Sequence, residues 1–274
     1  MSPTLPITAM PSTTPFAIYP SLQKKVVFIS GGSSGIGAEI VKSFAAQGSQ
    51  VAFCGTKPDG GNGLIADITA AGFKAPYYEA CDVRDIAALQ AMLERIDAKL
   101  GTIQVLVNNA GRDDRHSLDE LTPEYWDNCL NLNLRHQVFA TQTVARKLRA
   151  TGTSGSIVNM GSISWMRGRP NLIGYTTAKA AISGMTRTLA RELGEFGIRV
   201  NALVPGAIVT ARQTEKWRNP EEDKKFIELQ CLKFRLDSTH VARPTLFLAS
   251  DDSDGITGQN LLVDAGLAQV SVAG

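Results

Sequence analysis

The sequence is poor in cysteine, and its cysteines follow no pattern typical of a disulfide framework or a metal site. Cys54, Cys81, Cys129 and Cys231 are widely separated and form no C-x-x-C pair. Isolated thiols of this kind are typical of reduced, mostly buried cysteines. We therefore expect a cytoplasmic protein with no bound metal.

The sequence also lacks a basic tract and a strong charge of either sign. The formal net charge is +2, and the basic residues are scattered over the 274 residues. Proteins that follow a phosphate backbone usually carry clustered Lys and Arg, so nucleic acid is not expected as a partner. Hydrophobic residues make up 43% and charged residues 20% of the chain. These values are ordinary for a globular protein and indicate neither disorder nor a membrane span.

The pattern of a secretory signal is missing as well. Residues 1–20 are rich in Pro, Thr and Ser, and no Lys or Arg comes before Lys24, so a basic start and an apolar stretch are both absent. We expect residues 1–22 to form a flexible arm and residues 23–274 to form a single domain, which a chain of this length allows.

The first clear pattern is an apolar run, Val26–Ile29, followed by a glycine-rich segment, Ser30–Gly37. A helical pattern covers residues 38–47, and Gly48 ends it. Strand, glycine turn and helix in this order aim backbone N–H groups at a pyrophosphate, and glycine lets the ligand approach the backbone closely. A glycine run alone can be a simple turn, but this order favours a nucleotide site.

Apolar strand-like runs alternate with helical patterns along the rest of the chain. The further strands are expected at residues 51–54, 75–81, 105–107, 156–160, 200–204 and 261–263. The further helices are expected at residues 65–72, 86–100, 126–149 and 178–194. This alternation predicts an α/β fold: one doubly wound, Rossmann-type domain with a mostly parallel seven-stranded sheet and helices on both faces.

Tyr175 and Lys179 are four residues apart, so on a helix they occupy one face, one turn from each other. Because a neighbouring ammonium favours the phenolate, Lys179 is expected to lower the pKa of Tyr175 toward the working pH. Such a tyrosine can exchange a proton with a substrate oxygen. The pair alone is more often a surface contact, so its function depends on motifs elsewhere.

Together these motifs resemble the short-chain dehydrogenase/reductase family. The Thr-Gly-x-x-x-Gly-x-Gly turn of the family is similar to Ser30–Gly37, its Asn-Asn-Ala-Gly motif to residues 108–111, and its Tyr-x-x-x-Lys pair to Tyr175 and Lys179. The resemblance covers residues 24–267. It implies an oxidoreductase that uses a nicotinamide dinucleotide.

The resemblance also implies a catalytic set formed by Asn133, Ser162, Tyr175 and Lys179. Tyr175 would be the acid/base group and Lys179 would tune it and hold the nicotinamide ribose. Ser162 would donate a hydrogen bond to the substrate oxygen. Asn133 would support a water-linked proton path from Lys179 to solvent.

The implied cofactor site consists of Gly31, Ser33, Ser34, Gly35, Ile36, Gly37, Gly55, Thr56, Lys57, Asp82, Val83, Asn109, Ala110, Gly111, Tyr175, Lys179, Pro205, Gly206, Ile208 and Thr210. A carboxylate at the end of the second strand would bind the ribose 2′-hydroxyl of NAD. Gly55 stands there instead, followed by Thr56 and Lys57, which suit a 2′-phosphate, so NADP is favoured over NAD. Asp82 could instead cap the following helix.

A narrower similarity links residues 109–116, 161–165, 212–217 and 230–233 to bacterial D-xylose 1-dehydrogenases of this family, which oxidise the anomeric carbon of an aldopyranose to a lactone. The sugar site that it implies consists of Asp113, Asp114, His116, Ser162, Ser164, Trp165, Arg169, Asn171, Tyr175, Gln213 and Trp217. The similarity departs at Met166, where those enzymes carry a histidine. The sugar therefore stays open among D-xylose, L-arabinose, D-galactose and L-fucose types, and a ketone or 3-oxoacyl reductase is the alternative.

Two further expectations concern the whole molecule. Residues 211–236 are longer and more charged than a connector needs, which predicts a helical lid over the pocket. Relatives in the family usually form tetramers through the helices that correspond to residues 126–149 and 178–194, so the resemblance implies a homotetramer.

Overall fold

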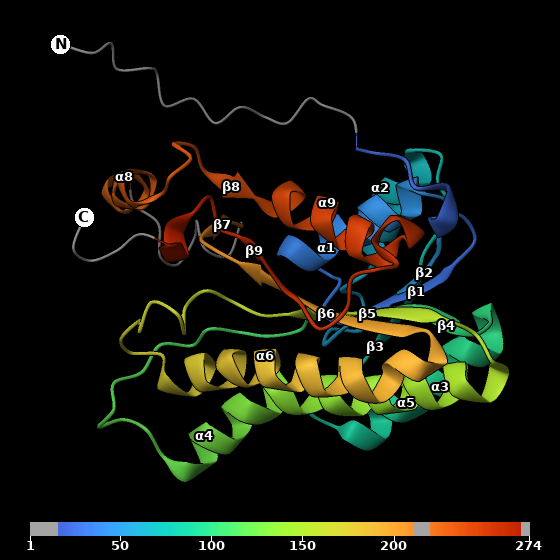
Figure 1. Cartoon of the computed structure of the whole chain (residues 1–274), viewed down its shortest axis with the longest axis horizontal. Coiled ribbons are helices and arrows are strands. Elements are labelled where there is room, and N and C mark those ends of the chain that lie inside the picture. The colour runs from blue at the N-terminus through green and yellow to red at the C-terminus, as the bar shows by residue number, and fades with distance from the viewer. Residues whose placement is uncertain (1–15, 211–219, 270–274) are drawn as a thin grey trace.

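The structure, a computed structural model, describes residues 16–210 and 220–269. Its centre is a seven-stranded sheet in the order β3-β2-β1-β4-β5-β6-β9 (Figure 1). The strands are β1 (Val26–Ile29), β2 (Gln50–Gly55), β3 (Tyr77–Ala80), β4 (Ile103–Asn108), β5 (Gly155–Met160), β6 (Ile198–Pro205) and β9 (Asn260–Val263). All neighbouring strands of this sheet pair in parallel. The predicted fold class is therefore confirmed.

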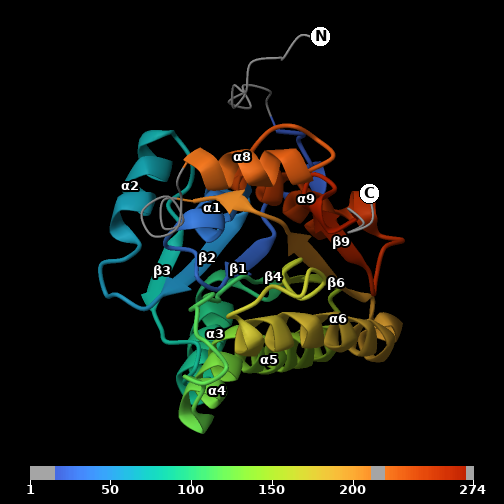
Figure 2. The same ribbon diagram turned by 90° about the vertical axis from the view of Figure 1, so that its left-hand side faces the viewer.

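Helices cover both faces of the sheet, as Figures 1 and 2 show. One face carries α1 (Gly35–Ala46), α2 (Asn62–Ala70) and α9 (Ser238–Ala249), and the other carries α3 (Ile86–Leu100), α4 (Pro123–Leu130), α5 (His136–Thr151) and α6 (Ile173–Leu193). Each face has its own apolar core: Phe44 and Phe53 lie in the first, Phe28 and Leu93 in the second. Because both faces are covered, a strand such as β1 is buried at every position and has to be apolar throughout.

Helix α9 does not follow from helix propensity, because Pro244 lies inside it and removes a backbone donor. Its first turn is closed by a reciprocal cap. The Asp237 carboxylate accepts from the backbone N–H of Thr239 at 2.9 Å, and Nδ1 of His240 accepts from the backbone N–H of Asp237 at 3.2 Å. The helix then packs against α1 and buries Leu246 in the core, and this burial outweighs the proline.

The single helix predicted over residues 126–149 is wrong in one respect. Between α4 and α5 the chain forms a π-helical turn, η2 (Asn131–Arg135), which places Asn133 in the interior, fully buried. The expected periodicity of 3.6 residues cannot reveal this turn, because a π turn adds one residue locally. Helix α6 begins at Ile173, earlier than the predicted start at residue 178, so Tyr175 lies in its first turn.

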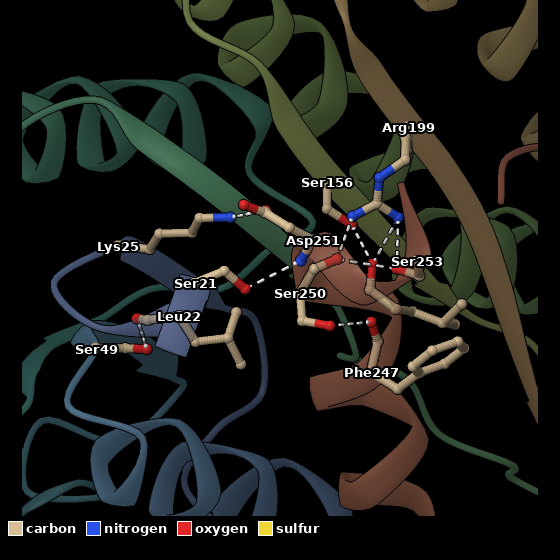
Figure 3. A network of polar contacts seen from close by, with 11 residues as sticks. Ser21, Leu22, Lys25, Ser49, Ser156, Arg199, Phe247, Ser250, Asp251 and Ser253 are labelled. Carbon is tan, nitrogen blue, oxygen red and sulfur yellow. Dashed lines mark hydrogen bonds and ion pairs between the residues drawn. The ribbon is translucent and has the colours of Figure 1, made fainter. Parts of the chain in front are cut away.

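A network of hydrogen bonds closes the amino ends of β5 and β6 (Figure 3). The guanidinium of Arg199 donates to the carbonyl oxygens of Leu248 and Ser250 at 2.8 and 2.9 Å, and Ser156 Oγ also donates to Leu248 at 2.7 Å. The carboxylate of Asp251 accepts from the side-chain nitrogen of Lys25 at 2.6 Å. This end of the sheet is therefore fixed by α9 and the loops around it.

The opposite end of the sheet, where the parallel strands have their carboxyl ends, carries the irregular segments. There the short strands β7 (Ile208–Val209) and β8 (Leu236–Asp237) pair in parallel, and α8 (Pro220–Leu229) lies beside them (left in Figure 1, toward the viewer in Figure 2). In doubly wound sheets this is the end at which ligands bind. Over the described ranges, no helix has the length and apolar content needed to cross a membrane.

Candidate active site

A cavity of about 720 Å³ opens at the carboxyl ends of the strands. Its wall includes the expected cofactor residues Gly31, Ser33, Ser34, Gly35, Ile36, Gly37, Gly55, Thr56, Asp82, Val83, Asn109, Ala110, Gly111, Tyr175, Lys179, Pro205, Gly206, Ile208 and Thr210. Lys57 is the exception: it is exposed and does not line the cavity. Its carbonyl oxygen accepts the hydroxyl hydrogen of Tyr78, so the loop backbone at Lys57 is held against β3.

The glycine turn between β1 and α1 has no room for a side chain at Gly31 or Gly37. A Cβ atom on Gly37 would lie 2.1 Å from the carbonyl oxygen of Gly31, and one on Gly31 would lie 2.9 Å from Cα of Ala110. Gly31 also has a φ of 67°, which favours glycine. The Ser34 side chain does not cap α1, and the first turn of α1 has no acidic residue. The helix N-terminus thus faces the cavity with its N–H groups toward an anion, which fits a pyrophosphate.

Ser30 ties the glycine turn to the turn after β4. Its Oγ, fully buried, accepts from the backbone N–H groups of Asn109 and Ala110, both at 3.1 Å. In return, Nδ2 of Asn109 donates to the carbonyl oxygens of Ser30 and Gly31 at 3.1 and 3.0 Å. The two turns that the sequence assigned to one ligand are therefore held as a single unit.

The end of β2 has room for a side chain at position 55 only if the Ser33 hydroxyl moves. A Cβ atom on Gly55 would lie 2.1 Å from Oγ of Ser33. At the neighbouring strand end, the carboxylate of Asp82 accepts from Nε of Arg84 at 2.9 Å, and Nη1 of Arg84 donates to Asn128 on α4 at 2.7 Å. Asp82 does not cap α3: Asp85 does, accepting from the backbone N–H of Ala88 at 3.0 Å. Asp82 is thus left to face the cavity.

Tyr175 and Lys179 share one face of α6, with Nζ of Lys179 5.6 Å from the centre of the Tyr175 ring. Lys179 is 3% exposed and its Nζ donates to the carbonyl oxygen of Met160 at 2.7 Å. Burial lowers the pKa of Lys179 to about 8. Burial also raises the pKa of Tyr175, Asp113 adds to the rise, and Ser162 and Arg169 oppose it.

These directions differ from the expectation that Lys179 lowers the pKa of Tyr175. The ammonium lies 5.6 Å from the ring centre and bonds to a backbone carbonyl, and the groups that lower the pKa of Tyr175 in this structure are Ser162 and Arg169. Ser162 is buried and its Oγ donates to Oγ of Ser164 at 3.0 Å. Of these two serines, Ser164 lines the cavity wall.

The Asn133 side chain bonds to the loop after β4 and to α4. Its Oδ1 accepts from the backbone N–H of Arg112 at 2.8 Å, and its Nδ2 donates to the carbonyl oxygens of Arg112 and Cys129 at 3.1 and 3.0 Å. A Cβ atom on Gly111 would lie 2.9 Å from Oδ1 of Asn133 and 3.3 Å from Nζ of Lys179, so Gly111 lies between these two side chains. Asn133 therefore positions the loop after β4 beside Lys179; the proton path stays a prediction.

Behind the same loop lies His136, fully buried at the start of α5. Its Nε2 lies 3.1 Å from the carbonyl oxygen of Ala110. Burial, together with the charge of Lys179, lowers the pKa of His136 to about 4, so the ring is neutral and donates this bond. Sequence reasoning did not identify His136, because its partner is a backbone group 26 residues away.

The expected sugar-binding residues divide into three groups. Asp113, Ser164, Arg169 and Tyr175 line the cavity, whereas Asp114, His116, Ser162, Trp165 and Asn171 are not part of its wall. Gln213 and Trp217 lie outside the described residues. Residues that sequence reasoning did not place at the site, but that line the cavity, include Arg167, Asp223, Phe226 and Arg235.

His116 and Asn171 contribute to the site indirectly, by joining two loops. The backbone N–H of His116 donates to the carbonyl oxygen of Asn171 at 3.0 Å, and the His116 ring packs against Tyr125 with ring centres 4.6 Å apart. Asp114 forms an ion pair with Arg112. The loops after β4 and β5 are therefore connected at the mouth of the cavity.

The described part of the predicted lid is α8 and the segment that follows it. Phe226 on α8 contacts two cations: the guanidinium carbons of Arg169 and Arg235 are 5.9 and 5.2 Å from its ring centre. Arg235 also pairs with Asp223 at 3.4 Å. Contacts from α8 thus reach the loop after β5; that this segment closes over a substrate stays a prediction. Among the described residues, no group of His, Cys, Asp or Glu is arranged to hold a metal ion.

Known proteins that are similar to this chain in sequence or structure carry the names of dehydrogenases and reductases. Residues 31–268 match the family model described as enoyl-(acyl carrier protein) reductase. The chain is 47% identical to the D-xylose 1-dehydrogenase of Caulobacter vibrioides over 91% of its own length and 98% of that protein. It is 43% identical to a probable galactose dehydrogenase of Rhizobium meliloti over 93% and 99% of the two lengths. A solved structure titled as a putative gluconate dehydrogenase from Agrobacterium tumefaciens is 27% identical with a TM-score of 0.87, covering 93% of this chain and all of that one.

Proposed function

The chain belongs to the short-chain dehydrogenase/reductase family, and we propose that it is an NAD(P)-dependent dehydrogenase that oxidises the anomeric hydroxyl of an aldopyranose to a lactone. Two relatives with more than 40% identity over most of their length carry the names of sugar dehydrogenases. The family accounts for the nucleotide site and the catalytic set. Whether the substrate is a sugar depends on the residues that line this chain's own cavity.

Asp113 supplies the main support. It lines the cavity, and its charge acts on the pKa of both Tyr175 and Lys179, so a carboxylate lies beside the reacting group. A carboxylate accepts hydrogen bonds from neighbouring hydroxyls, as a sugar ring presents them. An acyl chain packed over it would bury an unpaired charge at a large cost in free energy. Asp113 therefore favours a substrate with several hydroxyls over an apolar ketone.

In the proposed reaction the proton of the anomeric hydroxyl passes to Tyr175 while C1 becomes the carbonyl carbon of the lactone. When bound, a nicotinamide dinucleotide supplies the acceptor for the hydride that leaves C1. The single hydroxyl hydrogen of Ser162, which Ser164 accepts in this structure, would turn to the substrate oxygen in the reaction. Lys179, held by Met160, would bind the nicotinamide ribose.

For the nucleotide we propose NADP over NAD. Gly55 lacks the carboxylate that would bind a ribose 2′-hydroxyl, and Thr56 lines the cavity next to it. Lys57 follows Thr56 in the sequence and is exposed, so it can approach a 2′-phosphate only from outside the cavity wall. Initial rates with NAD and NADP at equal concentration test this choice, and a large preference for NAD would contradict it.

A panel of D-xylose, L-arabinose, D-galactose and L-fucose, read by nicotinamide absorbance, tests the function. We expect turnover with at least one of these sugars or with a close derivative of its ring. Ketone and 3-oxoacyl substrates form the second arm, because a 3-oxoacyl-[acyl-carrier-protein] reductase of Chlamydia trachomatis is also 34% identical to the chain over 90% of its length. Good turnover of a ketone with no turnover of any sugar would overturn the proposal.

A further inference from the structure

The loop between β2 and α2, residues 56–61, is held from outside by Tyr78 on the neighbouring strand β3. The Tyr78 hydroxyl donates to the carbonyl oxygen of Lys57, and the backbone N–H of Gly60 donates to the same oxygen at 3.0 Å. The second bond closes a turn within the loop, whereas the first ties that turn to the sheet. The backbone of Lys57 is therefore fixed although its side chain is exposed.

The ring of Tyr78 supports the other end of the same loop. A Cβ atom on Gly61 would lie 2.4 Å from Cγ of Tyr78, so the backbone of Gly61 rests directly on the ring. The ring also packs against Phe53, which is fully buried, with ring centres 5.0 Å apart. A Cβ atom on Gly32 would in turn lie 2.7 Å from Cβ of Phe53. Contacts therefore run from the glycine turn through Phe53 and Tyr78 to the loop after β2.

The Tyr78 hydroxyl lies next to the cavity wall at the end of β2 without being part of it. Gly55 and Thr56 line the cavity, whereas Lys57 and Tyr78 do not. A Cβ atom on Gly55 would lie 3.3 Å from Oη of Tyr78. In a doubly wound fold this strand end faces the adenosine ribose and distinguishes a 2′-hydroxyl from a 2′-phosphate. Tyr78 thus supports the part of the wall at which the two nucleotides differ.

The composition of the loop explains why such support matters. Two of its six residues are glycines, and Gly61 precedes α2 without a side-chain cap. Glycine allows many backbone conformations, and a loop that becomes ordered only on binding lowers the affinity. Tyr78 orders this loop before the nucleotide arrives, so its effect falls on the group of the nucleotide that the loop contacts.

We propose that Tyr78 is a positioning residue for nucleotide choice: its hydroxyl and ring hold Lys57 and Gly61 so that the loop accepts the 2′-phosphate of NADP. NAD carries a hydroxyl in place of this phosphate and gains less from a fixed loop with a lysine. This inference rests on the proposed choice of NADP and deepens it by naming a residue outside the cavity wall on which that choice depends.

Tyr78→Phe removes the hydroxyl and keeps the ring. We expect the ratio of kcat/KM for NADP to NAD to fall about threefold or more, as the loss of one hydrogen bond predicts. The fall should come from a higher KM for NADP, without a decrease in kcat, because hydride leaves at the other end of the nucleotide. Tyr77→Phe is the matched control, since the Tyr77 hydroxyl donates to Glu79 at 3.0 Å and its ring packs on the opposite face of the sheet. A tyrosine with a merely structural role would lower stability or both activities and leave the ratio unchanged, which would overturn the inference.

Gly61→Ala disturbs the same ring from the loop side. The new Cβ atom would meet Cγ of Tyr78 at 2.4 Å, so the ring or the loop has to move, and we expect a similar fall in the ratio. Gly63→Ala adds the same methyl group in open space on α2 and should leave the ratio unchanged. Equal ratios in these two variants would contradict the proposal.

Binding without turnover separates this inference from the proposed function. Adenosine 2′,5′-bisphosphate and adenosine 5′-monophosphate differ only in the 2′-phosphate, and calorimetric titration gives the affinity for each. We expect the wild type to bind the bisphosphate more tightly and Tyr78→Phe to reduce this difference about threefold or more. If no sugar is oxidised, the proposed oxidation fails, and this comparison still tests Tyr78. A difference that Tyr78→Phe leaves unchanged would overturn the inference alone, whereas no preference for the bisphosphate in the wild type would overturn the choice of NADP and the inference with it.

Discussion

The side-chain nitrogen of Lys179 lies 2.7 Å from the carbonyl oxygen of Met160. This bond fixes the lysine, on α6, against the last residue of β5, one helical turn from Tyr175. Holding the ammonium there costs solvation, and burial lowers the pKa of Lys179 to about 8. The proposed catalytic set therefore contains a charge that the fold tolerates at a cost in free energy, and this cost can be measured.

Lys179→Met should change how stability depends on pH. In the folded wild type the lysine loses its proton near pH 8, whereas in the unfolded chain it keeps the proton until about pH 10.5. In this window the unfolded chain binds more protons, so the free energy of unfolding rises with pH, by about 2 kcal/mol between about pH 7 and about pH 9.5. The variant lacks this rise. Urea unfolding at both pH values checks it, and parallel curves for the two proteins would contradict the buried charge.

Tyr175→Phe should abolish turnover and leave nucleotide binding intact. The phenol is the proposed acid/base group, and general acid–base catalysis contributes roughly 10²–10⁴ in rate. Steady-state rates give kcat, and fluorescence titration gives the affinity for the nucleotide. Tyr77→Phe is the control, because the Tyr77 hydroxyl bonds only to Glu79 at 3.0 Å among the described contacts. Near-normal turnover in the Tyr175 variant would remove the proposed mechanism.

Ser162→Ala should move the pH profile of oxidation to higher pH. Burial raises the pKa of Tyr175 and the Ser162 hydroxyl opposes this rise, so removing the hydroxyl makes the phenolate harder to form. We expect the alkaline rise of kcat to shift upward and the rate at neutral pH to fall. Ser156→Ala serves as the control. Ser156 lies at the other end of β5, where its hydroxyl donates to the carbonyl oxygen of Leu248, so this substitution should change stability alone. A lower rate with an unshifted profile would limit Ser162 to substrate positioning.

Gly55→Asp should reverse the proposed preference for NADP. The new Cβ atom meets Oγ of Ser33, which has to rotate, and the carboxylate then repels a 2′-phosphate and accepts from a 2′-hydroxyl. We expect the ratio of kcat/KM for NADP to NAD to fall at least about tenfold. Gly63→Asp adds the same side chain in open space on α2 and should leave the ratio unchanged. A loss of both activities without a change in ratio would show that position 55 only sets the shape of the wall.

His136→Gln should make the protein less sensitive to acid. Burial lowers the pKa of His136 to about 4, so between about pH 4 and 6.5 the unfolded chain binds a proton that the folded chain does not. The free energy of unfolding of the wild type therefore falls by about 2 kcal/mol from about pH 7 to about pH 5 through this group. Glutamine can still donate to Ala110 and does not titrate. The difference between the two unfolding curves at these pH values measures the effect, and no difference would mean that His136 is protonated in the folded state.

The fold was predictable where one physical rule governs a long segment. Buried parallel strands must be apolar, so the run from Val26 to Ile29 was visible, and α3 follows from a regular amphipathic pattern. Helix α9 was not predicted because Pro244 argues against it locally, whereas packing on α1 decides. The turn at Asn133 was not predicted because it breaks the periodicity on which helix prediction depends.

The site could be predicted where it depends on the local shape of the backbone. It could not be predicted where side chains from distant segments meet. Steric space alone explains why Gly31 and Gly37 are needed, so the nucleotide turn was clear from the sequence. The neighbourhood of Phe226 depends on how α8 lies against the loop after β5, which no local pattern encodes. His116, which was expected to contact the sugar, does not line the cavity, and its backbone N–H joins two loops; the sugar contact stays a prediction.

The π-helical turn at Asn131–Arg135 also determines in which direction the side chains of the following helix point. Such a turn amounts to one extra residue in an otherwise regular helix, and one residue rotates the later side chains by about 100° around the axis. Asn133 faces Arg112 and His136 faces Ala110 only in this phase. Deleting one residue here would give a smoother helix pointing the wrong face at the active site. The irregular turn thus keeps the side chains at the start of α5 facing the loop that follows β4.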